Sequence, residues 1–167
     1  QIKSGDPMRD ETLNGPMINQ QAFERNVQWI EEATAAGAEV LSGASAFDAS
    51  RNIWKPTLLT HVNASMKVWS EEVFAPVAIL DTVRDFDAGI SKLNQSRFGL
   101  QNAVFTDSVQ QAKTAFHQLK SGSVLINSAP GFRMDHMPYG GIKDSGEGLE
   151  GIRYAMDAFT TSRLLVW

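Results

Sequence analysis

Hydrophobic positions near the start of the chain recur at the spacing of an amphipathic helix. Between residues 19 and 37, apolar side chains fall three or four positions apart, with charged and amide side chains on the other faces. Asn19 is a typical N-cap residue, and Gly37 suits the C-terminal end of a helix. The face that we expect to be buried consists of Phe23, Val27, Ile30 and Ala33.

Two extended segments follow this helix. Residues 39–42 have the pattern of a short strand, and residues 53–60 read as extended, with the strongest signal at residues 57–60. The small residues from 43 to 52 indicate a loop between them. Pro56 cannot donate a ladder hydrogen bond, so we expect the strand beside it to lie at the edge of a sheet.

An acidic turn then leads into a third strand. Ser70 is a helix-capping residue, and Glu71 and Glu72 would stabilise the positive N-terminus of a short helix that begins there. Pro76 prevents that helix from continuing, and the apolar residues after it predict a strand over 77–82. Two carboxylates are therefore expected at the mouth of a buried strand.

Helix and strand patterns alternate from residue 85 onward. Helix patterns over 85–94 and 108–119 alternate with strand patterns over 101–106 and 123–127. Short connections between such elements are typical of crossover helices on a parallel sheet. We therefore expect an α/β protein with a parallel sheet and crossover helices.

The C-terminal part is dominated by a long, glycine-rich loop over residues 128–148. A loop of this length in a compact domain is usually functional or disordered. A helix over 149–159 and a final apolar strand over 163–167 are predicted to follow it.

Charge and composition exclude several classes of function. The formal net charge is −4 and no run of Lys or Arg occurs, which argues against nucleic acid or an anionic membrane surface as a partner. No apolar run is long enough to span a membrane, and no signal peptide is recognised, so a cytoplasmic protein is expected. The absence of Cys excludes disulfides and a cysteine nucleophile within these residues. The histidines show no metal-ligand spacing, and no metal site is predicted.

One literal motif match is rejected. Residues 146–151 read G-x-G-x-x-G, the pattern of a dinucleotide-binding turn, but residues 140–145 before them have no strand character. Glu147 and Glu150 would also place negative charge beside a pyrophosphate. We therefore do not interpret this segment as a cofactor phosphate site.

Several segments, in order, instead resemble the aldehyde dehydrogenase superfamily. Residues 70–77 resemble the family motif E-E-[VI]-F-G-P, residues 122–127 resemble G-x-[VI]-x-[VI]-N, and residues 138–148 resemble P-[FY]-G-G-x-K-x-S-G-x-G. The matches follow one another at family spacing along essentially the whole chain, which makes them more specific together than any one alone. Ala75 and Leu149 depart from the family pattern, which has Gly and Arg at these positions.

The resemblance implies oxidation of an aldehyde to the carboxylic acid. In the family a cysteine thiolate forms a thiohemiacetal, hydride passes to NAD or NADP, and a glutamate-activated water releases the acid. The nucleophile, the general base and the dinucleotide-binding domain would lie before residue 1. This chain is therefore expected to be a truncated piece with no catalytic residue of its own, inactive alone and binding neither NAD nor NADP alone.

The same resemblance divides the chain. Residues 1–159 would correspond to the C-terminal part of the catalytic domain, and residues 160–167 to the start of the oligomerisation strand. The expected partners are a small-molecule aldehyde substrate and further copies of the chain in a homo-oligomer. A stand-alone, non-catalytic assembly or binding module derived from this fold is the alternative.

Four residues carry the binding roles that the resemblance implies. Glu72 is expected to contact the nicotinamide ribose of the cofactor, and Phe74 to pack near the same half. Arg133 lies in an Arg-x-Asp-His-x-Pro pattern that resembles the branch acting on phosphorylated or phosphonate aldehydes, such as non-phosphorylating glyceraldehyde-3-phosphate dehydrogenase. Its guanidinium is expected to bind an anionic substrate group, with Tyr139 lining the pocket. The alternatives are a solvated, helix-capping Glu72 and an Arg133 that pairs with Asp135 or solvent and only shapes the loop.

Overall fold

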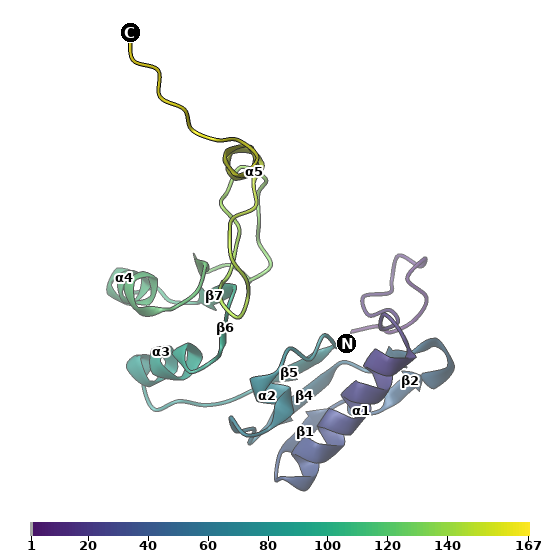
Figure 1. Ribbon diagram of the computed structural model, residues 1–167. Coiled ribbons are helices and arrows are strands. Elements are labelled where there is room, and N and C mark those ends of the chain that lie inside the picture. The colour runs from purple at the N-terminus through teal and green to yellow at the C-terminus, as the bar shows by residue number, and fades with distance from the viewer. Residues whose placement is uncertain (1) are drawn as a thin grey trace. The chain divides into compact units, whose positions relative to one another are not determined.

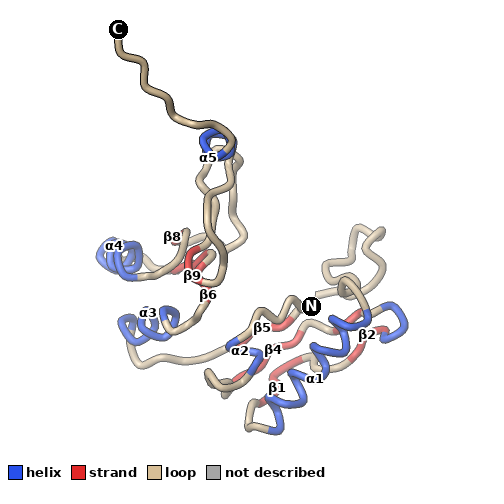
Figure 2. Tube along the Cα trace, viewed as in Figure 1, coloured by secondary structure: helices blue, strands red, loops and turns tan. Residues whose placement is uncertain are grey.

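The computed structural model describes residues 2–167, which form two compact units (Figure 1). The first unit ends at Thr82, and the second runs from Val83 to Trp167. Helices and strands occur in both units, as the colours of Figure 2 show. The α/β class expected from the sequence is confirmed.

The first unit is built on a three-stranded sheet and one long helix. The helix α1 (Gln20–Ala35) begins at the predicted cap, where the Asn19 side chain accepts a hydrogen bond from the Ala22 amide at 2.8 Å. Gly37 follows it with a φ of +104°, a conformation that favours glycine. The strands lie in the order β1 (Glu39–Ser42), β4 (Thr57–Thr60) and β5 (Val77–Ile79), with β1 antiparallel and β5 parallel to β4.

β4 is the central strand of this sheet, so the edge position predicted from Pro56 is wrong. Pro56 lies just before the strand, and the hydrogen bond that proline cannot donate is therefore lost outside the ladder. The first amide of β4, that of Thr57, donates to the Pro76 carbonyl at 2.8 Å. Leu59 has 0% of its surface exposed, and Leu58 and Thr60 on the other face of the strand are half-buried.

The predicted loop over 43–52 contains part of a small hairpin. β2 (Ala46–Asp48) and β3 (Ile53–Trp54) pair antiparallel, and the single-turn 3₁₀ helix η1 (Ala49–Arg51) connects them. The Asp48 carboxylate accepts hydrogen bonds from the amides of Ser50 and Arg51. Hydrogen bonds from the backbone to the Asp48 side chain thus hold this segment together. The alternation of apolar residues that predicts strands does not reveal such bonds.

The core of the first unit includes one unpaired polar side chain. Phe23 meets Trp54 edge to face with ring centroids 5.6 Å apart, and the Trp54 indole N–H donates to the Thr57 hydroxyl at 2.9 Å. Asn26 on α1 has 0% of its surface exposed, and its amide has no hydrogen-bond partner among the described residues. Its burial destabilises the fold because bonds to water are lost without replacement.

The second unit contains the parallel pair that the alternating pattern predicts. β7 (Gln101–Val104) and β8 (Ser123–Ile126) pair in parallel, and α4 (Val109–Gln118) connects them. The helix α3 (Phe86–Asn94) precedes them and contacts α4. Asp85 and Ser108 cap α3 and α4 as predicted. The buried residues of this small core are Ile90, Ala115 and Leu119.

The long loop closes back onto the start of the second unit. β9 (Ile142–Lys143), inside the loop, pairs antiparallel with β6 (Phe98–Gly99). The helix α5 (Ile152–Ala158) follows and is shorter than the predicted helix over 149–159. It begins late because Glu150 forms a bridge with Tyr139 and because Gly151 has a φ of +123°.

The strand predicted over residues 163–167 is absent. Residues 160–167 have no regular secondary structure and extend from α5 as the yellow end of the trace (Figure 1). A strand needs a hydrogen-bonded neighbour, and the described residues supply none to this segment. The side chains of Leu164, Leu165, Val166 and Trp167 are 71–105% exposed.

Replacing Asn26 with leucine is expected to stabilise the protein by about 1–3 kcal/mol, because leucine has nearly the shape of asparagine and no group to desolvate. The free energy of unfolding from urea denaturation measures the effect. Gln21→Leu, on the exposed face of the same helix, is the matched control and should change stability little. A less stable Asn26→Leu protein would show that the amide has a partner and contradict this account.

Candidate functional site

The acidic turn follows a short helix and does not begin one. The helix α2 (Lys67–Ser70) ends at Ser70, whose hydroxyl donates back to the Met66 carbonyl at 3.3 Å, so the predicted N-cap role of Ser70 is wrong. Met66 and Val68, at the start of α2, are buried. Their packing favours a helical turn that precedes the glutamates in the chain. Glu71 is the C-cap, and the glutamates gain nothing from a helix N-terminus.

Glu72 and Phe74 project from this turn as exposed side chains. Val73 and Ala75, which alternate with them, pack against the core of the first unit. This inward packing of every second side chain turns Glu72 and Phe74 outward. Phe74 is 72% exposed, so both residues implied in cofactor binding are accessible.

The backbone at Phe74 is held in an unusual conformation. Its φ of +53° lies in the left-handed region, which costs a large side chain about 1–3 kcal/mol and persists only where the surroundings enforce it. Arg25 on α1 provides one tether, because its Nη2 donates to the Val73 carbonyl at 3.3 Å. The Arg25 guanidinium also lies 5.2 Å from the centre of the Trp29 ring. Helical spacing predicts that Arg25 lies on the polar side of α1. It does not predict the hydrogen bond from Arg25 to Val73.

A cavity of about 440 Å³ in the second unit brings Arg133 and Tyr139 together. Strand β8 and Gln101 line one part of it, and residues from 132 to 139 line another. Arg133 is the only charged residue among the lining residues. The other residues that line the cavity are neutral.

Arg133 is held by two neighbours. Its guanidinium carbon lies 4.5 Å from the centre of the Tyr139 ring, and its Nη1 donates to Glu150 Oε2 at 2.9 Å. Arg133 therefore pairs with Glu150 and not with Asp135, the partner considered from the sequence. Glu150 is 17 residues away along the chain, which is why local spacing gave no sign of it.

A pair of backbone hydrogen bonds joins Tyr139 to Glu150. The Tyr139 amide donates to the Glu150 carbonyl at 3.1 Å, and the Glu150 amide donates to the Tyr139 carbonyl at 2.6 Å. Both side chains that contact Arg133 thus come from one antiparallel bridge. The position of the guanidinium depends on this bridge.

The glycine-rich motif anchors the same loop. Lys143 donates through Nζ to the carbonyl of Asn94, the last residue of α3, at 3.2 Å, and to that of Ser96, just after the helix, at 2.8 Å. The Ser145 hydroxyl accepts from the Gly99 amide at 2.9 Å. Lys143 and Ser145 therefore hold the loop in position and do not line the cavity.

Close backbone contact also requires glycine on the strand side of this loop. A Cβ atom at Gly122 would lie 1.7 Å from the Gly140 carbonyl oxygen, so no other residue fits without moving the loop. The contact holds the glycine turn against the start of β8.

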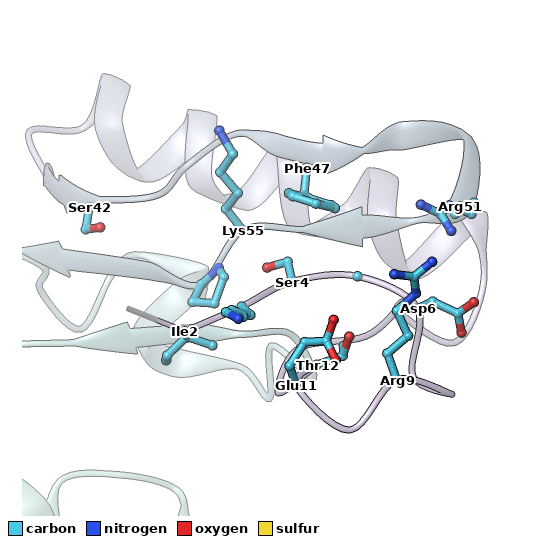
Figure 3. A pocket seen from close by; sticks show the side chains of 13 residues that line it. Ile2, Ser4, Asp6, Arg9, Glu11, Thr12, Ser42, Phe47, Arg51 and Lys55 are labelled. Carbon is cyan, nitrogen blue, oxygen red and sulfur yellow. The ribbon is translucent and has the colours of Figure 1, made fainter.

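A second cavity, of about 790 Å³, lies in the first unit, and no residue of the acidic turn lines it. The segment from Ile2 to Thr12 borders it opposite residues of the β2–β3 hairpin, among them Phe47 and Arg51 (Figure 3). Its charged lining residues carry both signs, as Arg9 and Glu11 illustrate. It contains none of the predicted site residues and favours no one class of ligand.

Two surface carboxyl groups have lowered pKa values. The Ser50 hydroxyl at 2.6 Å and the Arg51 guanidinium at 2.7 Å lower the pKa of Asp48 to about 2. Hydrogen bonds from Lys67 and Gln28 lower the pKa of Glu32. Both groups stabilise local structure in the first unit and lie outside the candidate site.

Two kinds of feature are absent from the described residues. Residues 2–167 contain no group of three or more His, Cys, Asp or Glu side chains placed to hold a metal ion. Within the same range, no helix has the length and apolar character needed to cross a bilayer.

Curated relatives resemble almost all of this chain. 3-Sulfolactaldehyde dehydrogenase from Priestia aryabhattai is 41% identical over 162 residues, which cover 97% of this chain and 33% of the relative. Sulfoacetaldehyde dehydrogenase from Neptuniibacter caesariensis is 38% identical over 162 residues, covering 97% of this chain and 35% of the relative. The chain therefore spans about a third of the length of these relatives.

Solved structures share its fold. Aldehyde dehydrogenase 21 from Physcomitrella patens, in complex with the reaction product succinate, superimposes with a TM-score of 0.89 at 36% identity over 93% of this chain and 32% of its own. Glyceraldehyde-3-phosphate dehydrogenase GapN from Methanocaldococcus jannaschii, complexed with NADP, gives 0.85 at 32% identity over 93% of this chain and 33% of its own. A betaine aldehyde dehydrogenase mutant from Staphylococcus aureus, in complex with NAD⁺, gives 0.90 at 29% identity over 97% of this chain and 34% of its own.

The motifs recognised in the sequence coincide with the elements that build the candidate site. The acidic motif is the turn that presents Glu72 and Phe74, and the glycine motif is the loop that carries Tyr139 and ends near Glu150. The family model of the aldehyde dehydrogenase family matches residues 1–165. The chain therefore belongs to the aldehyde dehydrogenase family.

Proposed function

We propose that this chain is part of the catalytic domain of an NAD(P)-dependent enzyme that oxidises an anionic aldehyde to the carboxylic acid. The observation that carries the substrate class is Arg133, the only charged residue lining its cavity of about 440 Å³. Its guanidinium is paired with Glu150 through Nη1 and keeps further N–H donors, which favours a ligand with one anionic group. The names of the sulfolactaldehyde and sulfoacetaldehyde dehydrogenases support the same class.

On the substrate side, Arg133 would bind the anionic group and Tyr139 would pack along the substrate. Fixing that end would orient the aldehyde carbon toward the attacking nucleophile. Such positioning of two reactants contributes strongly to the lowering of the reaction barrier by enzymes. The nucleophile is a cysteine thiolate outside these 167 residues, which contain no Cys. Oxidation would then proceed through a thiohemiacetal on that cysteine, and an activated water would release the acid.

On the cofactor side, NAD or NADP supplies the hydride acceptor when bound. The exposed Glu72 carboxylate fits this group, because its two oxygens can accept hydrogen bonds from two ribose hydroxyls. The exposed Phe74 ring offers an apolar surface beside it. Inward packing of Val73 and Ala75 holds both side chains in place.

We further propose that residues 1–159 form the C-terminal part of this catalytic domain and that residues 160–167 take part in homo-oligomer formation. The apolar residues 164–167 are 71–105% exposed and have no partner strand among the described residues. An unpaired segment of this kind favours pairing with another chain. The cytoplasmic location expected from the sequence stays a prediction.

Glu72→Gln in the full-length enzyme should slow hydride transfer and weaken cofactor binding, each by roughly ten-fold, if a charge-assisted hydrogen bond worth about 1.5–3 kcal/mol is weakened. Single-turnover kinetics and cofactor titration measure the two effects. Glu31→Gln, an exposed carboxylate on α1, is the control. Unchanged transfer rate and affinity would remove Glu72 from the cofactor site.

Arg133→Leu should reduce kcat/KM for an anionic aldehyde by roughly ten- to a hundred-fold, because a bond of about 1.5–3 kcal/mol to the anion is lost. A neutral aldehyde of similar size should be little affected. Arg153→Leu, an exposed arginine on α5, is the matched control. Equal losses on both substrates would show that Arg133 holds the loop and does not recognise charge.

Residues 163–167 should mediate self-association. Sedimentation at increasing concentration should show an oligomer for the unaltered protein and a smaller species for a Leu164→Lys, Val166→Lys double variant. Val109→Lys, at an exposed apolar position on α4, should leave the oligomer intact. A monomer at every concentration would contradict the proposal.

A further inference from the structure

We propose that Glu150 sets the charge selectivity of the Arg133 site, so that the site favours an aldehyde with a singly charged oxyanion, a carboxylate or a sulfonate, over one with a doubly charged phosphate. The inference rests on the proposed function and names the substrate class more narrowly. It departs from the phosphorylated or phosphonate substrates that the Arg-x-Asp-His-x-Pro pattern resembles.

The first observation is that the Glu150 carboxylate lies beside the guanidinium in an ion pair whose Glu150 side chain is 68% exposed. Its Oε2 lies 2.9 Å from Arg133 Nη1, and two backbone hydrogen bonds tie Glu150 to Tyr139. The Tyr139 ring in turn lies under the guanidinium, 4.5 Å from its carbon atom. Arg133 is therefore held from two sides by residues of one bridge.

The second observation concerns the hydrogen-bonding capacity that Arg133 retains. A guanidinium has five N–H donors, and the bond to Glu150 engages Nη1. Nε and Nη2 of Arg133 donate no hydrogen bond to any group within residues 2–167. The edge formed by Nε and Nη2 can donate two parallel hydrogen bonds to two oxygens of a single oxyanion. Carboxylates and sulfonates both present such a pair of oxygens.

The third observation is the charge balance. Arg133 is the only charged residue lining the cavity, and the carboxylate of Glu150 offsets its charge. The desolvation cost of an anion rises with the square of its charge, while its attraction to one cation rises only in proportion. The attraction of the paired arginine can therefore offset the desolvation cost of a monoanion but not that of a dianion. Glu150 also repels a dianion twice as strongly as it repels a monoanion.

Glu150 is thus a positioning residue with an electrostatic effect on specificity. Glu150→Gln separates the two roles, because glutamine can still accept from Nη1 but carries no charge. Glu150→Ala removes both. Glu147→Gln is the matched control, since Glu147 is exposed on the same loop and forms no ion pair with Arg133.

The experiment measures kcat and KM of the full-length enzyme for four aldehydes of similar size: a sulfonate, a carboxylate, a phosphate ester and a neutral compound. It is run at constant ionic strength near pH 8, above the second phosphate ionisation at about pH 6. Glu150→Gln should raise kcat/KM for the phosphate relative to the sulfonate about five-fold or more, mainly through KM. Glu150→Ala should weaken both anions relative to the neutral aldehyde, and Glu147→Gln should leave every ratio within about two-fold.

A measurement on the unaltered enzyme keeps the test independent of variant folding. Ethanesulfonate should inhibit competitively at concentrations about five-fold or more below those needed for ethyl phosphate. Equal or reversed inhibition, or a Glu150→Gln enzyme with an unchanged phosphate-to-sulfonate ratio, overturns the inference.

The pattern of results separates the two levels of proposal. If Arg133→Leu selectively removes activity on anionic aldehydes while Glu150→Gln leaves the phosphate-to-sulfonate ratio unchanged, only the role of Glu150 fails. If the unaltered enzyme does not distinguish anionic from neutral aldehydes, the proposed substrate class fails, and this inference fails with it.

Discussion

The backbone bridge between Tyr139 and Glu150 is the contact on which the position of the Arg133 guanidinium depends. It closes the glycine-rich segment into a loop and places two side chains from opposite ends of that loop against one guanidinium. The approach of Gly122 to Gly140 holds the loop against β8. Arg133 is itself an exposed loop residue, and its contacts with Tyr139 and Glu150 hold its guanidinium in place.

The two candidate binding regions use different physical means to present polar groups. At the acidic turn, alternate side chains are buried, and this packing turns Glu72 and Phe74 outward and stabilises a left-handed backbone at Phe74. In the second unit, an ion pair and ring contact hold Arg133 beside a cavity. The first arrangement suits hydrogen bonding to an extended cofactor. The second suits capture of a small charged group.

The charge at the second region is balanced within the protein. We expect an unpaired arginine to attract any anion, whereas we propose that one sharing its charge with Glu150 distinguishes ligands by charge and by the geometry of their oxygens. Such recognition would depend on both residues.

The sequence by itself was sufficient to locate the helices α1, α3 and α4, to predict the family and to name the candidate site residues. Caps such as Asn19, Asp85 and Ser108 act within one helical turn, so local spacing is sufficient to locate them. The ordered motifs were sufficient to predict the family to which residues 1–165 belong. Assigning Glu72 and Arg133 to ligands rested on the motifs, and their binding roles stay predictions.

Tertiary structure alone decided the features that depend on residues distant in the chain. It placed β4 in the centre of its sheet, left residues 163–167 without a partner strand, and gave Arg133 the partner Glu150 instead of Asp135. Local propensity does not encode strand order or an ion pair across 17 residues, because both arise only when the chain has folded back on itself. For the same reason the buried, unpaired amide of Asn26 appears in the sequence only as one more polar position on a helix.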